Sequence, residues 1–131
     1  MLITREVDYG IRIVRNLSID EYKSIVDIAQ KEHITKTIAH KLARILNKEG
    51  IIKSKRGIDG GYALNISLDE LRLYDIYVAL IDKPAINECL LDSYICPINK
   101  EKGCGVHQEL KRIQNILFEE FKRTPISKMI D

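Results

Sequence analysis

Residues 35–64 decide the fold, and they read TKTIAHKLARILNKEGIIKSKRGIDGGYAL. The first part of this stretch places apolar side chains three and four residues apart, which indicates one buried face of an α-helix. These side chains are Ile38, Leu42, Ile45 and Leu46. Thr35 is the expected N-cap, and Gly50 stands where a helix-ending glycine belongs. We therefore predict a helix over 36–49.

The pattern then changes from a helical period to short extended runs. IIKSK (51–55) is rich in β-branched residues, and YALNI (62–66) alternates apolar with smaller or polar side chains. Between them lies RGIDGG (56–61), with three glycines in six residues. Two short strands joined by such a turn predict a β-hairpin.

Two further helices are expected before this stretch. Residues 3–17 carry an apolar stripe that Thr4 could cap, and a second, short helix is expected over 25–32. Ser24 and Asp27 have the spacing of an approximate capping box for this second helix. Three helices followed by a hairpin is the order of a winged helix-turn-helix domain. The predicted fold class is therefore mainly α with a small β-hairpin.

The charge distribution supports contact with double-stranded DNA. The chain has 21 Lys and Arg against 19 Asp and Glu, a net charge of +2. Residues 33–63, however, contain seven basic and two acidic residues, whereas the remaining 100 residues contain 14 basic and 17 acidic ones. A local basic face is typical of phosphate binding. The alternative is an ordinary solvated, lysine-rich surface.

The residues expected to contact DNA lie on the predicted third helix and on the hairpin. On the helix and at its start they are Thr35, Lys36, Thr37, His40, Lys41 and Arg44. On the hairpin they are Lys55, Arg56, Gly57, Gly60, Gly61 and Tyr62. The glycines permit a close approach of the backbone, and Arg56 suits a narrow minor groove. The alternative is that any tight hairpin turn needs these glycines.

Downstream of the hairpin we expect three more segments. Ser67 and Glu70 predict a capped helix over about 68–82, and residues 83–104 lack a period and form a loop. A long amphipathic helix is expected over 105–123, with a seam for a second copy of the chain. The seam consists of Val106, Leu110, Ile113, Leu117 and Phe121. The predicted division is a DNA-binding domain over 1–82, a cysteine-bearing sensor loop over 83–104, and a dimerisation helix with tail over 105–131.

Three cysteines fall within sixteen residues of this loop, at Cys89, Cys96 and Cys104, and His107 follows closely. An odd number of thiols does not indicate a disulfide framework. Thiolates are soft ligands that suit zinc or iron–sulfur clusters. Because no two cysteines have the close spacing of structural zinc sites, an iron–sulfur cluster is favoured. Three thiolates leave a fourth position, for which His107 is one candidate. The alternative is that one or two are simply core thiols.

Other classes of protein are disfavoured. No Walker loop, HExxH motif or Ser/His/Asp arrangement is present, so we do not expect an enzyme. No apolar run approaches the length needed to cross a membrane, and the first residues lack the apolar core of a signal peptide. We therefore expect a cytoplasmic protein with no membrane association.

The same stretches resemble a known family. They are TREVDYGIRIV (4–14), LARILNKEGIIKSKRGIDGGYAL (42–64), LRLYDI (71–76) and the cysteine loop. Together they are similar to the Rrf-type winged-helix transcription regulators, whose members include IscR, NsrR, RirA and the cluster-free CymR. The resemblance implies a homodimer, joined through helix 105–123, on a palindromic operator.

The resemblance also implies an iron–sulfur cluster on the three cysteines. In NsrR-like members the fourth ligand is an Asp on the first helix of the other subunit, which matches Asp8. In IscR-like members it is a His that matches His107. Cys96-Pro97 together with Asp8 resembles the NsrR and RirA pattern, which favours 4Fe–4S over 2Fe–2S.

The expected function is a transcription regulator, a repressor or an activator, whose operator affinity is switched by a cluster sensing redox state, iron or nitric oxide. The alternative is a cluster-free winged-helix regulator controlled by thiol oxidation or by a partner protein.

Overall fold

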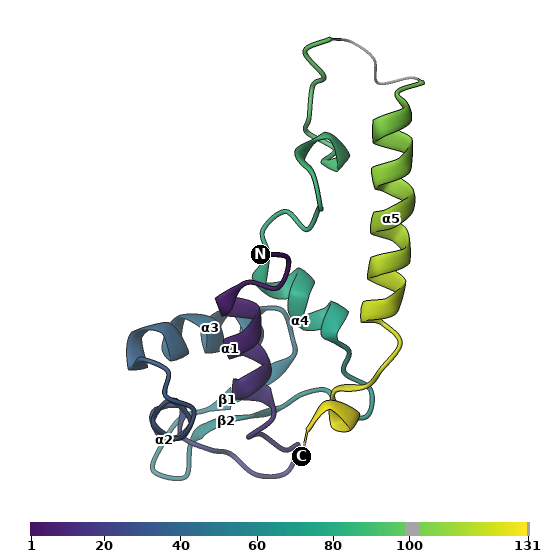
Figure 1. Cartoon of the computed structure of the whole chain (residues 1–131). Coiled ribbons are helices and arrows are strands. Elements are labelled where there is room, and N and C mark those ends of the chain that lie inside the picture. Colours follow the sequence, from purple (N-terminus) through teal and green to yellow (C-terminus); the bar gives the residue numbers. More distant parts are fainter. Residues whose placement is uncertain (99–102, 131) are drawn as a thin grey trace.

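The computed structural model describes residues 1–98 and 103–130. Within them the chain forms a winged domain with an extension made of the segment after α4 and the long helix α5 (Figure 1). The helices are α1 Arg5–Val14, α2 Ile25–Lys31, α3 Lys36–Lys48, α4 Leu73–Leu80 and α5 Gly105–Phe121. The strands are β1 Ile52–Lys55 and β2 Gly61–Leu64, and two short 3-10 turns are η1 Glu88–Leu90 and η2 Ile126–Met129.

The predicted order of three helices and a hairpin is confirmed. The side-chain oxygen of Thr4 accepts from the backbone N–H of Val7 at the start of α1, and that of Thr35 accepts from Ile38 at the start of α3. Gly50 has φ +78°, the left-handed conformation that ends α3. β1 and β2 pair antiparallel, with Ile52 opposite Leu64 and Lys55 opposite Gly61.

One core holds the winged domain together. α1, α3 and α4 pack on one another, and their fully buried side chains form a single cluster with residues from the hairpin. The largest include Ile13, Leu42, Leu46, Ile52, Leu64 and Ile76. The buried face of α3 consists of Ala39, Leu42, Ala43 and Leu46, whereas Ile38 and Ile45 are only half-buried. Two small alanines thus belong to the buried face, which the spacing of the larger apolar residues did not reveal.

Two predicted caps differ from the structure. Ser24 precedes α2 but makes no capping hydrogen bond with its side chain. The Ser67 hydroxyl accepts from the Glu70 N–H at 3.3 Å, yet this closes an isolated turn rather than starting a helix. α4 begins at Leu73 because Arg72 is extended and its N–H donates to the Asp75 carboxylate at 2.8 Å. The expected helix over 68–82 is therefore shorter at both ends.

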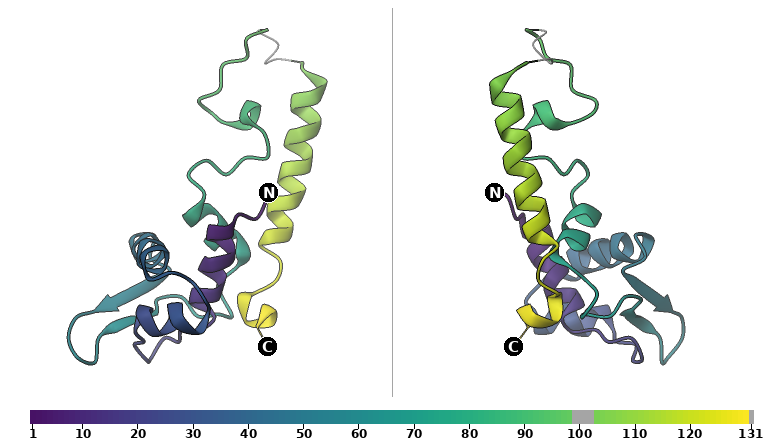
Figure 2. Two further views of the ribbon diagram at one scale, coloured as in Figure 1. Left: turned by 60° about the vertical axis from the view of Figure 1, so that its left-hand side comes forward. Right: turned by 90° about the vertical axis from the view of Figure 1, so that its right-hand side faces the viewer.

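The base of α5 is anchored on α4. The ring of Phe118 lies 5.6 Å from Tyr74 and 5.8 Å from Tyr77, and the ring of Phe121 lies 5.3 Å from Tyr77. The Arg72 guanidinium donates to the Lys122 carbonyl at 3.0 Å, just beyond the end of the helix. Towards its start α5 rises beside the segment that follows α4 (Figure 2).

The residues after α5 return to the winged domain. Ile126 is fully buried, and its N–H donates to the Leu71 carbonyl at 2.8 Å. The tail thereby closes the side of the core near α4. Over residues 1–98 and 103–130, no helix combines the length and apolar character needed to cross a membrane.

Candidate nucleic-acid interface and cysteine site

The third helix presents its polar side to solvent. Because Ala39, Leu42, Ala43 and Leu46 face the core, the side chains between them point outward. Lys36, Thr37, Lys41 and Arg44 are exposed and His40 is half-buried. Thr35 differs from these residues because its hydroxyl is the N-cap. The outward set offers donors to phosphates and to base edges in a major groove.

One of these donors already has a partner. The Lys41 ammonium lies 2.7 Å from the Glu6 carboxylate on α1, and both side chains are well exposed. This ion pair links the first turn of α1 to α3. A negative phosphate near Lys41 would compete with Glu6, so the pair lowers the gain from any contact between Lys41 and DNA.

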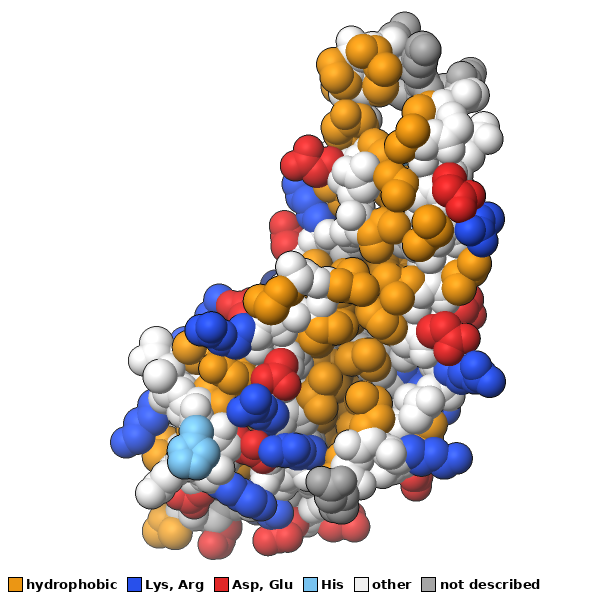
Figure 3. Space-filling model, in the orientation of Figure 1, with side chains coloured by type: hydrophobic (Ala, Val, Ile, Leu, Met, Phe, Trp, Pro, Cys, Tyr) orange, Lys and Arg blue, Asp and Glu red, His pale blue; other side chains and the backbone are white. Residues whose placement is uncertain are grey.

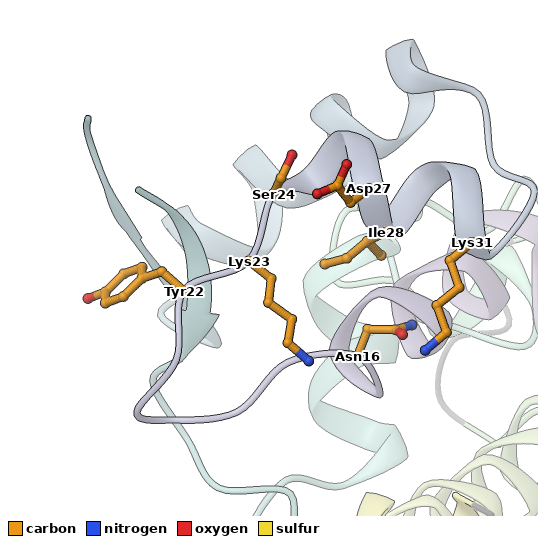
Figure 4. Close-up of a pocket in the computed structure, with 7 residues that line it drawn as sticks. All are labelled: Asn16, Tyr22, Lys23, Ser24, Asp27, Ile28 and Lys31. Carbon is orange, nitrogen blue, oxygen red and sulfur yellow. The ribbon is translucent and has the colours of Figure 1, made fainter. Parts of the chain in front are cut away.

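The wing has a cationic base. The ammonium groups of Lys53 and Lys55 lie 5.9 Å and 5.6 Å from the centre of the Tyr22 ring. Tyr22 and Lys23 leave the chain in opposite directions, so that Tyr22 faces the wing and Lys23 faces Asn16 (Figure 4). Tyr22 was not identified from the sequence as part of the site. The only signal was an aromatic residue within a polar loop. A cation beside an aromatic face is held in place yet remains open to phosphate.

Two glycines of the wing have a left-handed backbone. Gly57 and Gly61 have φ of +108° and +138°. A Cβ at Gly61 would lie 2.3 Å from the Lys23 carbonyl, because residue 23 pairs with Tyr62 along the outer edge of β2. The Tyr62 backbone is thus bonded to Lys23 on one side and lies opposite Ser54 on the other. Gly61 therefore serves the structure of the wing, because a side chain there would meet the Lys23 backbone.

A buried ion pair stiffens the helix-turn-helix turn. Glu32, only 6% exposed, accepts from Arg15 at 2.8 Å and from the Asn16 amide at 2.7 Å. The bond from Arg15 lowers the pKa of the Glu32 carboxyl, against the opposing effect of burial. Arg12 also donates to the Glu32 backbone carbonyl at 3.4 Å. The end of α1 is thereby tied to the turn between α2 and α3.

A hollow beside this network is lined by Asn16, Lys23 and Lys31 among others, with a volume of about 290 Å³ (Figure 4). Lys23 and Lys31 point towards Asn16, whose amide already donates to Arg12 and Glu32. Among the described residues, no interaction in this hollow indicates that it binds a ligand.

The cysteines line one cavity in the extension. This cavity of about 480 Å³ is bordered by the three thiols, by His107 and by a mainly apolar set of neighbours. The neighbours are Asn87, Leu91, Tyr94, Ile98 and Val106. None of the three cysteines forms a disulfide. Within residues 1–98 and 103–130, no three potential ligands are close enough together to hold a metal ion.

Asp8 lies elsewhere in the chain. Its carboxylate is paired with the Arg12 guanidinium at 2.9 Å, one turn further along α1, and Asp8 does not line the cysteine cavity. Of the two candidate fourth ligands, only His107 is therefore gathered with the thiols within one chain. The sequence could not distinguish them, because both have suitable chemistry.

The apolar face of α5 remains largely uncovered. α5 is 17 residues long and contains no buried residue. Val106 is 65% exposed, Ile116 53% and Ile113 40%, whereas Leu110, Leu117 and Phe121 are half-buried. Figure 3 shows apolar side chains in a band that runs from the extension down onto the winged domain. Phe121 belongs to the predicted seam but packs on Tyr77 of its own chain.

The three-helix core, the helix-turn-helix turn and the hairpin with a cationic base define a winged-helix DNA-binding protein. Comparison with known proteins gives the family. The Rrf2 family, described as an iron-dependent transcriptional regulator, matches residues 3–131, and the chain belongs to this family. It is thus a helix-turn-helix transcriptional regulator and not an enzyme.

Relatives agree with this assignment. The chain is 33% identical to protein rrf2 of Nitratidesulfovibrio vulgaris over 74% of its own length and 67% of that protein. It is similar to CymR, the global cysteine regulator of B. subtilis, with a TM-score of 0.73 and 25% identity over 97% of this chain and 94% of CymR. T. potens IscR shares the fold, with a TM-score of 0.67 and 17% identity over 96% of this chain and 83% of IscR.

Proposed function

We propose that the chain is one subunit of a homodimeric transcription regulator that binds a palindromic operator through α3 and the wing. We further propose that Cys89, Cys96 and Cys104 hold an iron–sulfur cluster that sets operator affinity. The observation that carries the second part is the cavity that gathers the three thiols with His107. The family description, an iron-dependent transcriptional regulator, points in the same direction.

The donor set suits a cluster in the kind of ligand that it offers. Three thiolates and an imidazole, or three thiolates and a carboxylate, complete the four ligands that small iron–sulfur clusters use. The thiols must move closer together to bind one, since no three potential ligands are grouped closely enough among the described residues. Because His107 lines the cavity within one chain, whereas Asp8 would have to reach it from the other subunit, we propose His107 as the fourth ligand.

Dimer formation is supported by α5. Its exposed Val106, Ile113 and Ile116 form an apolar face that nothing in this chain covers among the described residues. A helix that keeps one apolar face in water is stabilised by a second apolar face. A second copy of α5 offers the matching surface, with Phe118 and Phe121 holding the base of each helix on its own winged domain.

The chain has a direct path from the cysteine loop to α5. The N–H of Ile86 donates to the Gln114 side chain at 3.0 Å, and η1 lies against α5. A rearrangement of the loop would thus act on α5, while Arg72 and the Phe118 ring hold its base. In a dimer, a change in the crossing of two α5 helices changes the spacing of the two α3 helices. A bound cluster supplies a group that oxidants, nitric oxide or iron shortage can remove.

The test is purification without oxygen, followed by a visible spectrum and iron and sulfide analysis. We expect a coloured protein that loses its colour when any of the three cysteines is replaced by Ser. We expect His107→Ala to destabilise the cluster and Asp8→Asn to leave it intact. The reverse pattern would make Asp8 the ligand. A protein that stays colourless after iron and sulfide are supplied would refute the cluster.

A cluster-free regulator is the second candidate. It is favoured by the similarity to CymR at 25% identity and by the mainly apolar lining of the cysteine cavity. In that case oxidation of the thiols, rather than cluster loss, would change operator affinity. A colourless protein whose DNA binding responds to mild oxidant, and recovers with a reductant, would support this candidate.

A further inference from the structure

The tip of the wing carries a fully exposed apolar side chain. Ile58 is 105% exposed, the highest value among the large hydrophobic side chains of residues 1–98 and 103–130. Single exposed apolar residues are common on protein surfaces. The position of Ile58 is less common, because the hairpin projects from the body of the domain and Ile58 lies in its turn (Figure 2).

The turn has a defined shape that holds Ile58 outward. The N–H of Gly60 donates to the Gly57 carbonyl at 3.0 Å, which puts Ile58 and Asp59 at the two central positions of a tight turn. A Cβ at Gly60 would lie 2.3 Å from the Lys55 carbonyl, so the two arms of the turn are in close contact. Central turn positions favour Pro, Asn, Asp, Ser and Gly, and not β-branched apolar residues. Neither packing nor the preferences of turn positions therefore explain why an isoleucine stands at position 58.

The base of the wing has the opposite character from its tip. Lys53 and Lys55 lie beside Tyr22, and Arg56 is exposed where the turn begins. All three cations lie on β1 or at the start of the turn, so they suit the phosphates along one rim of a groove. An apolar tip beyond this cationic arm suits the interior of a minor groove, where DNA-bending proteins insert Ile, Leu, Phe or Met between base steps.

We propose that Ile58 inserts into the minor groove as an apolar wedge and that the Asp59 carboxylate accepts a hydrogen bond from a guanine 2-amino group. This inference rests on the DNA-binding function proposed above. In the minor groove only the G·C pair offers a donor, and a negative side chain is disfavoured in the narrow groove of A-tracts. Pyrimidine–purine steps are the easiest to unstack. A CA/TG step combines both properties, so the wing tip selects such a step in each half-site, with Arg56 on a phosphate at the rim.

Binding measurements test the wedge. The probe is a duplex selected by the wild-type protein from a randomised pool, compared with an unselected duplex at the same salt concentration. We expect Ile58→Ala to lower affinity for the selected duplex about tenfold and for the unselected duplex by less than about twofold. Ile19→Ala is the matched control, because Ile19 is also exposed, at 40%, but lies outside the wing. Ile58→Thr keeps the β-branched shape and should give an intermediate loss.

Base analogues test the contacts directly. Inosine lacks the 2-amino group of guanine but presents the same major-groove edge. We expect inosine at the CA/TG step to weaken wild-type binding several-fold and to leave Asp59→Asn binding nearly unchanged. A 2-aminopurine in place of the adenine of that step should brighten on binding of the wild-type protein, because unstacking relieves quenching, and should not brighten with Ile58→Ala.

The outcomes separate this inference from the DNA-binding proposal. If the wild-type protein binds and selects no duplex, the proposed DNA-binding function fails and the wing contact fails with it. If the wild-type protein selects a duplex that Arg44→Ala binds poorly, while Ile58→Ala and Asp59→Asn bind it like the wild type, only the wing-tip contact is overturned. Inosine sensitivity that is equal in the wild type and in Asp59→Asn would also overturn it.

Discussion

Replacing Glu32 by Gln tests the buried ion pair at the helix-turn-helix turn. The substitution keeps the size of the side chain but removes the charge and turns an amide donor towards Arg15, which also donates. Breaking a buried ion pair costs about 3–5 kcal/mol when the remaining charge stays buried. The Arg15 side chain is 45% exposed, so water can solvate it, and we expect a loss of roughly 2 kcal/mol.

The assay is thermal unfolding followed by circular dichroism at one protein concentration. A loss of this size lowers the Tm by roughly 8 °C for a domain of this length. Glu109→Gln is the matched control. Glu109 forms a similar ion pair with Arg112 at 2.7 Å, but both side chains are more than half exposed, so we expect no measurable change.

The pH dependence makes the same test sharper. Because the folded-state pKa of Glu32 is lowered, its contribution is fully present above the unfolded pKa of about 4.3 and is lost as the pH falls through the lower, folded value. The difference in Tm between wild type and Glu32→Gln should therefore shrink on acidification below about pH 4. An equal difference at neutral and acid pH, or an equal loss in Glu109→Gln, would refute the reasoning.

Three further substitutions test other parts of the structure. Arg44→Ala should weaken binding to all duplexes and reduce the salt slope by about 1, measured by titration at several salt concentrations, because a phosphate contact is lost. Phe118→Ala should destabilise the fold by ~2 kcal/mol in denaturant unfolding, since the half-buried ring contacts Tyr74 and Tyr77. Gly61→Ala should lower the Tm more than Gly50→Ala, because both have positive φ but only Gly61 lacks room for a Cβ.

Local sequence patterns predicted the helix-turn-helix unit and the hairpin well. Thr35 and Gly50 act on the backbone within a few residues of themselves, so their roles can be inferred without knowing the rest of the fold. The predicted start of α4 was wrong because it depends on a contact with a distant residue. Ser67 and Glu70 do form their local hydrogen bond, but Arg72 is extended and bonded to Asp75 and to the Lys122 carbonyl. The last of these partners lies far away in the sequence.

The candidate site also contains some residues that local sequence patterns could identify and others that they could not. The basic residues of α3 could be identified from helical spacing alone, because their outward direction follows from the position of the apolar ones. Tyr22 beside Lys53 and Lys55, and Glu6 beside Lys41, could not, because each pair joins elements that only packing brings together. The three cysteines could be recognised from their clustering in the sequence, but that they line one cavity with His107 could be seen only from the path of the chain.

The sequence by itself determined the kind of protein. The apolar period, the caps and the glycine-rich turn specify a winged helix because each acts over a few residues. The local excess of Lys and Arg over residues 33–63 marks the part that we expect to face DNA. The tertiary structure alone decided that Glu32 bonds to Arg15, that Phe118 packs on Tyr77, and that the three thiols line one cavity with His107. Contacts between distant residues depend on how all elements pack at once, and no local pattern contains that information.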